Sequence, residues 1–312
     1  MQNKSVDVII PTFRPGRKFD ILLQRLLAQN VPPRRIIVVN TGEEYWDSEH
    51  IREVCGGQVP EVFHVSREEF DHGGTRDLAI QRSDADAFIC MTQDAVPCDR
   101  DLIENLLKML YSEDDVAAVC ARQLAAPDCG IIERYTRQFN YPETSRMKRE
   151  SDLPAMGIKT FFCSNVCAAY RRDIYDRMGG FLKKTVFNED MIYAGLAIRR
   201  GYAVGYCAEA KVIHSHNYGA MEQVHRNFDL AVSQADHPEV FGGISSEGEG
   251  IQLVKRTAAY LMRHGRALLL PKLVLHSGCK YTGYLLGKNY RKLPKWMVRR
   301  LTMNQSYWSG VL

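Results

Sequence analysis

Several features that mark other classes of protein are missing from this chain of 312 residues. No run of apolar residues approaches the roughly 18–20 that a membrane span needs. The best candidate, residues 267–275, is short and is interrupted by Pro271 and Lys272. The N-terminus is polar and leads directly into a strand-like segment. We therefore expect neither a signal peptide nor a membrane-spanning helix.

Cysteine frameworks and several nucleotide-binding patterns are also missing. The nine cysteines are scattered, and none forms a Cys-x-x-Cys pair. An odd number of cysteines without a framework favours reduced thiols in the cytosol. The patterns GxxxxGK[ST] and GxGxxG are absent, which excludes a Walker loop and a dinucleotide fingerprint. No nucleophile elbow occurs, so nothing in the sequence indicates covalent catalysis.

Acidic residues are absent from the last 62 positions. Residues 251–312 carry twelve Lys and Arg, whereas the first 250 residues hold the other 29 basic residues and all 37 acidic ones. A net charge of +4 therefore combines an acidic body, at −8, with a basic tail. The tail interleaves basic residues with aromatic ones such as Tyr284 and Trp296, which is typical of contact with an anionic membrane surface. As alternatives, the tail helices dock on the body or on another subunit, or bind nucleic acid.

Short apolar runs alternate with amphipathic segments along the first part of the chain. Strands are predicted at 6–11, 35–40, 61–65, 87–92 and 116–121, helices at 19–29, 75–82, 100–111 and 190–200, and a loop followed by a helix within 42–54. The alternation predicts an α/β fold, with a mainly parallel sheet and helices on both faces. Residues 122–160 look less regular, and 203–206 and 211–214 look like two short strands. Residues 238–250, rich in Gly, Ser and Glu, are expected to join body and tail.

Polar residues follow the predicted strands. Thr12 and Arg14 follow the first strand, Asn40 the second and Asp94 the fourth. Ligands on parallel sheets bind beyond the carboxyl ends of the strands, so this placement predicts a nucleotide site. The segment 71–76 (DHGGTR) adds two glycines and a cation at the start of a helix, where backbone N–H groups can approach phosphate closely.

Two further motifs supply a candidate base and candidate metal ligands. Glu189 and Asp190 open a predicted helix, whose backbone dipoles hold carboxylates in place. His214 and His216 are two residues apart after a strand, so their side chains point the same way. A carboxylate at a strand end, such as Asp94, suits Mg²⁺ or Mn²⁺. The structural alternatives are helix or turn capping by the acidic residues and a core position for a histidine.

The order and spacing of these motifs over about residues 5–230 resemble the inverting nucleotide-sugar glycosyltransferases of family 2, which have the GT-A fold. The segments 70–77 and 91–95 are most similar to those of bacterial polysaccharide rhamnosyltransferases. The resemblance implies transfer of L-rhamnose from dTDP-β-L-rhamnose to a growing, lipid-linked cell-wall or capsular polysaccharide. It further implies a cytoplasmic protein, peripheral on the inner face of the membrane, with no nucleic-acid partner and with homo-oligomers possible.

The same resemblance implies roles for single residues. Asp190, the second acid of the pair, is the catalytic base that deprotonates the acceptor hydroxyl. Asp94 holds a divalent cation, Mg²⁺ or Mn²⁺, with His214 or His216 completing its shell. Family members usually have Asp-x-Asp at this point, whereas this chain has Thr92-Gln93-Asp94. The residues expected to bind the donor nucleotide are Pro11, Thr12, Arg14, Asn40, Asp71, Gly74, Arg76, Gln93 and Asp94.

The acceptor side and the division of the chain are also expectations from the resemblance. Ser164 and Asn165 lie where the family shapes its acceptor pocket. A GT-A catalytic domain is expected at 1–237, with a nucleotide-sugar half at about 1–121 and an acceptor half at about 122–237. A basic amphipathic helical tail is expected at 251–312. The alternative functions are a transferase with a UDP-sugar donor, or a non-catalytic carbohydrate- or membrane-binding paralogue that lost activity with the first aspartate of Asp-x-Asp.

Overall fold

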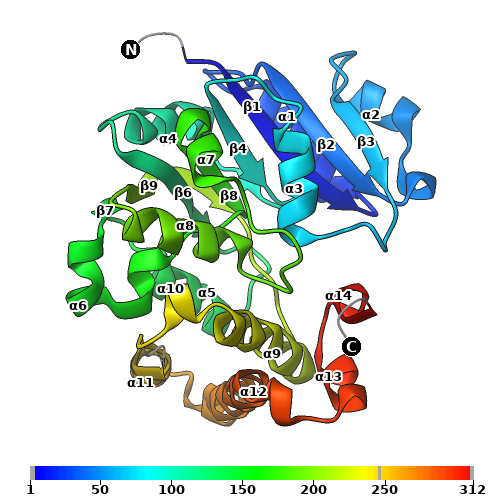
Figure 1. Ribbon diagram of the computed structural model, residues 1–312. Coiled ribbons are helices and arrows are strands. Elements are labelled where there is room, and N and C mark those ends of the chain that lie inside the picture. The colour runs from blue at the N-terminus through cyan, green and yellow to red at the C-terminus, as the bar shows by residue number, and fades with distance from the viewer. Residues whose placement is uncertain (1–3, 245–246, 310–312) are drawn as a thin grey trace.

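The computed structural model of the chain describes residues 4–244 and 247–309. Within them, one nine-stranded sheet has the strand order β3–β2–β1–β4–β8–β6–β9–β5, and β7 pairs with β9 at its side (Figure 1). The strands are β1 (Val6–Phe13), β2 (Arg35–Thr41), β3 (Glu61–Val65), β4 (Ala87–Met91), β5 (Val96–Pro97), β6 (Val116–Leu124), β7 (Arg146–Lys148), β8 (Cys167–Arg171) and β9 (Ala203–Ile213).

The sheet is mainly parallel, as the sequence predicts. β1 to β4 run in one direction, and β6 and β9 are parallel to each other. β8 runs antiparallel between β4 and β6, and the short strands β5 and β7 run antiparallel to β9. Because β8 is antiparallel to both β4 and β6, these two strands point the same way. The carboxyl ends of the parallel strands therefore meet at one edge of the sheet.

Helices cover both faces of this sheet. They are α1 (Arg17–Leu27), α2 (Ser48–Val54), α3 (His72–Ile80), α4 (Leu102–Leu110), α5 (Ile131–Asn140), α6 (Leu153–Met156), α7 (Arg172–Met178), α8 (Glu189–Arg199), α9 (Ala220–Asp236), α10 (Pro238–Phe241), α11 (Glu247–Arg263), α12 (Leu270–Lys288), α13 (Lys295–Leu301) and α14 (Gln305–Ser309). Short 3₁₀ turns are found at Glu43–Tyr45, Glu150–Asp152, Gly157–Phe161, Ala267–Leu269 and Tyr290–Lys292.

Two apolar cores lie on the two faces, and the alternation of side chains along β1 shows how they divide. Val8 and Ile10 pack with the apolar faces of α1 and α4, whereas Ile9 belongs to the core formed with α3, α7 and α8. The strands β1, β2, β4 and β6 bury both of their faces along most of their length, which explains why they look like continuous apolar runs in the sequence.

Some predicted elements differ from the observed ones. The region 203–214 forms one long strand, β9, rather than two short ones. Its pairing with β6 shifts register between Ala121 and Arg122, and this irregularity lies where the sequence becomes polar. The region 122–160, predicted as irregular, contains α5 and β7. The amphipathic helix α5 escaped prediction because its apolar residues are interleaved with arginines.

The C-terminal helices fold back on the body of the same chain. α12 lies along α9, and α13 and α14 bring the chain towards the strand ends (Figure 1). A Cβ atom at Gly283 would lie 2.2 Å from the carbonyl oxygen of Val224, and one at Gly287 equally close to that of Phe228. Docking on the body, one of the alternatives that the sequence allows, is therefore what the structure contains. Among the described residues, no helix combines the length and apolar character that crossing a membrane requires.

Candidate functional site

The predicted site residues at the ends of β1 and β2 are buried and bond to one another. Thr12 donates its hydroxyl hydrogen bond to Asn40 Oδ1 at 3.1 Å, and the Asn40 amide donates to the carbonyl oxygen of Gly42 at 2.7 Å. Gln93 is engaged as well, because its amide accepts from the Phe13 N–H at 2.9 Å and donates to the Phe13 carbonyl at 3.0 Å. These three side chains fix the backbone of the strand ends.

The residues beside them form an exposed rim at the same edge. Arg14 has a left-handed backbone, φ 49°, which is uncommon for a residue with a side chain. Its guanidinium donates to the Tyr45 hydroxyl at 2.8 Å and lies over the rings of Tyr45 and Phe13. Arg67 lies over the Phe13 ring as well, 4.9 Å from its centre. Aromatic rings and guanidinium groups thus line the entrance beyond β1.

The start of α3 is built for close backbone approach. Asp71 caps the helix by accepting from the Gly74 N–H at 2.6 Å. A Cβ atom on Gly73 would lie 1.9 Å from the carbonyl oxygen of Leu182, so only glycine fits against the loop before α8. Arg76 is buried and forms an ion pair with Glu189 Oε1 at 3.1 Å. The predicted diphosphate cation is therefore engaged with the acidic pair in this structure.

The two acids at the start of α8 have different environments. Glu189 is buried beside Arg76 and accepts from the Asn165 amide at 3.1 Å. Burial alone would raise the pKa of Glu189, but Arg76, His72 and Asn165 together hold it below its usual range. Asn165 also donates its backbone N–H to Asp190 Oδ2 at 2.8 Å. One buried asparagine, predicted for the acceptor pocket, thus holds both carboxylates, while Ser164 accepts from the Gln123 amide at 3.1 Å.

Asp190 has the properties of a base that works near neutral pH. Burial, and next the negative charge of Glu189, raise the pKa of Asp190 to about 7, against the opposing hydrogen bonds from the N–H groups of Asn165 and Met191. Two neighbouring carboxyl groups whose pKa values are driven apart are a common sign of acid–base chemistry. Asp190 as a whole residue is intermediate between buried and exposed.

Asp94, His214 and His216 come together as a candidate metal centre. One ligand atom from each lies within 4.8 Å of the others. Asp94 lies 3.5 Å from His214 Nε2 and 3.4 Å from His216 Nε2, and the two Nε2 atoms are 3.0 Å apart. Burial lowers the pKa of His214 to about 3, so its ring is neutral, as metal binding requires.

A residue that the sequence analysis did not single out orients this centre. Gln123, buried on β6, lies with its Oε1 3.1 Å from Nδ1 of His214. The Arg137 guanidinium donates a hydrogen bond to the same oxygen of Gln123. With the proton of His214 on Nδ1, this oxygen accepts two hydrogen bonds. The Nε2 lone pair of His214 is then free to face Asp94 and His216. Carbonyl groups that orient metal-ligating histidines in this way are common in metal sites.

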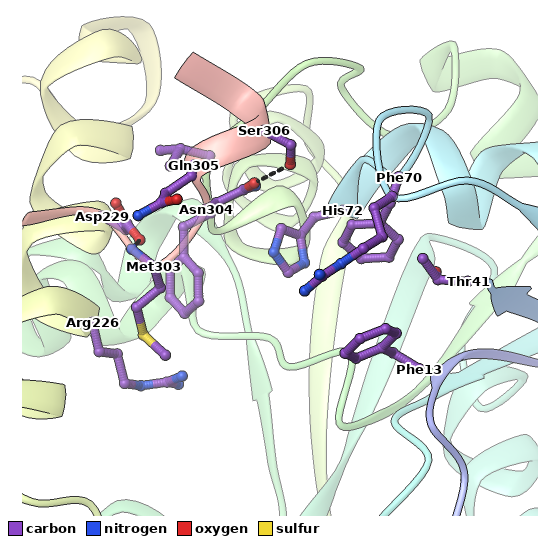
Figure 2. A pocket seen from close by; sticks show the side chains of 13 residues that line it. Phe13, Thr41, Phe70, His72, Arg226, Asp229, Met303, Asn304, Gln305 and Ser306 are labelled. Carbon is purple, nitrogen blue, oxygen red and sulfur yellow. Dashed lines mark hydrogen bonds between the residues drawn. The ribbon is translucent and has the colours of Figure 1, made fainter. Parts of the chain in front are cut away.

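A cavity of about 540 Å³ opens beside the strand ends and α3 (Figure 2). Its walls come from three parts of the chain: the strand ends and the loop before α3, the segment before α8 with α9, and the segment 303–306. The lining residues are Phe13, Thr41, Arg67, Phe70, His72, Val186, Phe187, Arg226, Asp229, Met303, Asn304, Gln305 and Ser306.

The predicted donor residues stand beside this lining rather than in it. Phe13 and Thr41 line the cavity, whereas Thr12 and Asn40 next to them are turned into the protein. Successive side chains of a strand point to opposite faces, so an offset of one residue separates the two sets. In the sequence, the aromatic and arginine residues beside the polar motifs were the signal for this lining. The residues 303–306, which also line the cavity, had no such signal.

Comparisons with known proteins show the family of the chain. Residues 7–179, more than half of the chain, match the family described as Glycosyl transferase family 2. The chain belongs to this family. The O-antigen chain rhamnosyltransferase RfbN of Salmonella typhimurium is 37% identical over 310 residues, with 98% of this chain and 96% of that protein covered. The O-antigen chain rhamnosyltransferase WbaN of Salmonella anatum is 34% identical over 312 residues, with the same coverage. The family 2 member described here is a glycosyltransferase, as the sequence predicts.

Solved structures with low sequence identity share the fold. The mannosyltransferase PcManGT from Pyrobaculum calidifontis, solved with GDP-Man and Mn²⁺, matches with a TM-score of 0.56 and 15% identity, covering 98% of this chain and 85% of that one. S. aureus TarS 1–349, solved with UDP-GlcNAc, matches with a TM-score of 0.52 and 15% identity, covering 92% of each chain. Together with the mainly parallel sheet, these likenesses confirm the expected GT-A fold, and the helical C-terminal region is present.

Proposed function

We propose that this family 2 glycosyltransferase transfers L-rhamnose with inversion from dTDP-β-L-rhamnose to a saccharide of a growing, lipid-linked surface polysaccharide. The observation that carries the proposal is the difference between the two acids that open α8, since Glu189 is paired with Arg76 while Asp190 has a pKa raised to about 7 and is partly exposed. The rhamnosyl specificity draws its support from RfbN and WbaN, which are both named as O-antigen chain rhamnosyltransferases.

Asp190 acts as the base in this mechanism. It takes the proton of an acceptor hydroxyl while the hydroxyl oxygen bonds to the anomeric carbon of rhamnose. The bond from that carbon to the diphosphate oxygen breaks, and the nucleoside diphosphate leaves from the opposite face. A base with a pKa near the working pH is efficient in such a transfer. Glu189 stays ionised and maintains the raised pKa of its neighbour.

Asp94, His214 and His216 would hold a divalent cation, Mg²⁺ or Mn²⁺. The carboxylate fits either ion, the two neutral imidazoles would complete its shell as nitrogen ligands, and Gln123 already orients His214 for this. When bound, the cation would supply positive charge for the departing diphosphate. The Mn²⁺ recorded with PcManGT is a further support. These donors fit the cation although the first aspartate of Asp-x-Asp is missing.

Release of dTDP from dTDP-rhamnose tests the proposal. We expect turnover with a rhamnose-accepting saccharide and Mn²⁺ or Mg²⁺, its loss with EDTA, and a loss of about 10²–10⁴-fold for Asp190→Asn. The control is Asp114→Asn, an exposed aspartate far from α8 in the sequence. Turnover with a UDP-sugar instead would replace the donor assignment. No turnover with any donor, and indifference to Asp190→Asn, would favour the non-catalytic paralogue.

We also propose that the tail places the enzyme on the inner, anionic face of the cell membrane, where a lipid-linked acceptor lies. The region around the turn between α11 and α12 supports this, because Leu268 in the turn is 95% exposed and Leu275 in the first part of α12 is 58% exposed. The exposed cations Arg263, Arg266 and Lys272 flank them. Apolar side chains surrounded by cations suit anionic lipid.

Vesicle binding distinguishes membrane contact from a merely solvated surface. Vesicles that contain phosphatidylglycerol should bind the protein, vesicles of phosphatidylcholine alone should bind it less, and Leu268→Asn should weaken binding. Val59→Asn, at an apolar position of the body that is 50% exposed, is the control. Equal binding of all three proteins, or no preference for anionic lipid, would remove the membrane proposal.

A further inference from the structure

The segment between α13 and α14 is held firmly on both of its sides. Thr302 donates its hydroxyl to Asp229 Oδ1 at 2.7 Å, and the Met303 N–H donates to Asp229 Oδ2 at 2.8 Å. Asp229 lies on α9 and is only 2% exposed. Beyond the segment, Trp308 is buried in the cluster that contains Val186 and Phe228. The residues between these anchors, 303–306, therefore have a defined place.

Contacts within the folded chain do not explain the side chains that this segment exposes. Met303 is 54% exposed, and Gln305 and Ser306 are exposed too, yet all three line the cavity (Figure 2). The Gln305 side chain makes no hydrogen bond to another residue within the described ranges. A thioether and an amide at the wall of a cavity, on a segment held by a buried carboxylate, have the chemistry of a binding surface.

The opposite wall has the chemistry of a nucleoside site. Phe13 and Phe70 offer rings, and Arg67 lies over the Phe13 ring. Thr41, a residue of the cavity lining at the end of β2, is 4% exposed, and its buried hydroxyl has no hydrogen-bond partner among the described residues. A buried hydroxyl without a partner is costly, so a ligand that pairs with it is expected here. This wall also lies at the strand ends where nucleotides bind on such sheets.

We propose that residues 303–306 form the second wall of the donor site and contact the nucleoside of the nucleotide sugar. The proposal rests on the proposed function, because it requires a nucleoside diphosphate donor. Met303 packs against the nucleoside, and the Gln305 amide bonds to its polar edge, opposite Phe13, Thr41 and Arg67. Asp229 is a positioning residue that acts through the segment. The C-terminal end of the chain is then part of donor specificity.

Calorimetric binding of dTDP in the presence of Mn²⁺ tests the wall directly. Gln305→Ala should weaken binding about fivefold, as the loss of one hydrogen bond predicts, and the double variant with Met303→Ala should weaken it about tenfold or more. The matched controls are Gln252→Ala and Met262→Ala on α11, which are equally exposed and distant from the lining. They should bind dTDP like the wild type.

Asp229→Asn provides a second, independent test. The variant should also weaken dTDP binding, because the amide cannot accept from both Thr302 and the Met303 N–H in the same way. Its Mn²⁺ binding, measured without nucleotide, should be unchanged, which a general loss of structure would not allow.

The outcomes separate this proposal from the proposed function. If the wild type binds dTDP and the Gln305 and Met303 variants bind it with the same affinity, the proposed wall is overturned while the proposed function stands. If the substitutions raise only the KM for the saccharide acceptor, the segment belongs to the acceptor site, and this result also overturns the proposed wall. If the wild type binds UDP rather than dTDP, the same comparison is made with UDP. A wild-type protein that binds no nucleoside diphosphate would remove both proposals.

Discussion

At the scale of single residues, the main feature is that two adjacent acids have pKa values shifted in opposite directions. Glu189 is buried against Arg76 and keeps its charge, whereas Asp190 has its pKa raised to about 7 by burial and by the charge of Glu189. Asn165 contacts both acids, so the difference does not come from separate scaffolds. It comes from where the compensating cation lies, because Arg76 pairs with the first acid only.

This difference predicts the pH dependence of the reaction. A base works only when it is deprotonated, so kcat/KM should rise with pH and level off above an apparent pKa of about 7, the value for Asp190. Glu189→Gln removes the neighbouring negative charge and should move this apparent pKa to lower pH. Rates measured between pH 5 and 9 on the wild type and this variant check both statements. A flat profile in the wild type, or a shift to higher pH in the variant, would contradict them.

The orientation of His214 makes a second prediction at this scale. Gln123→Leu removes the oxygen that holds Nδ1, so the metal affinity should fall by about 10–100-fold. Mn²⁺ titration followed by electron paramagnetic resonance measures this directly. Gln252→Leu, on the exposed face of α11, serves as the control and should leave the affinity unchanged. Equal affinities in all three proteins would show that Gln123 has no part in the metal site.

At the scale of elements, the close packing of α12 on α9 depends on two glycines. A Cβ at Gly283 or Gly287 would lie 2.2 Å from a backbone carbonyl oxygen of α9, which cannot move without shifting the helix. Either Gly→Ala change should therefore destabilise the protein by about 1–3 kcal/mol. Gly278 lies on the same helix with nothing within 4 Å, and Gly278→Ala should stabilise by up to about 1 kcal/mol through helix propensity. Urea unfolding measures all three, and equal effects would refute the packing argument.

The comparison of sequence with structure also belongs to this scale. The buried parallel strands of the first 121 residues were predictable because they are short apolar runs, as in β2, which ends at Asn40 and Thr41, whereas the buried antiparallel strand β8 was not predicted. Which side chain faces the cavity was not predictable from the sequence, because it depends on whether Asn40 or Thr41 points outward at the end of the strand. The grouping of Asp94 with His214 and His216 could be expected from residue types and order, whereas Gln123 lies 91 positions from His214 and has no local signal. Contacts made by the tail were beyond prediction for the same reason.

At the scale of the whole molecule, the basic tail and the acidic body form one packed structure. α12 packs along α9, Asp229 of α9 holds residues 302 and 303, and Trp308 is buried beside Val186, just before α8. The sequence-based division at residues 237 and 251 stays a proposal about how the chain is organised by function. Physically, the same helix α9 carries Arg226 into the cavity and supports the tail.

We therefore expect body and tail to unfold together. A variant with Trp46→Phe and Trp296→Phe keeps only Trp308, whose fluorescence then reports the anchor of the tail, while far-ultraviolet circular dichroism reports all helices and strands. Because Trp308 packs against α9 and the segment before α8, the two signals should change at the same temperature. An earlier fluorescence transition would mean that the tail detaches first. The C-terminal wall of the cavity would then be a separately stable element, and donor affinity would fall with temperature before the body unfolds.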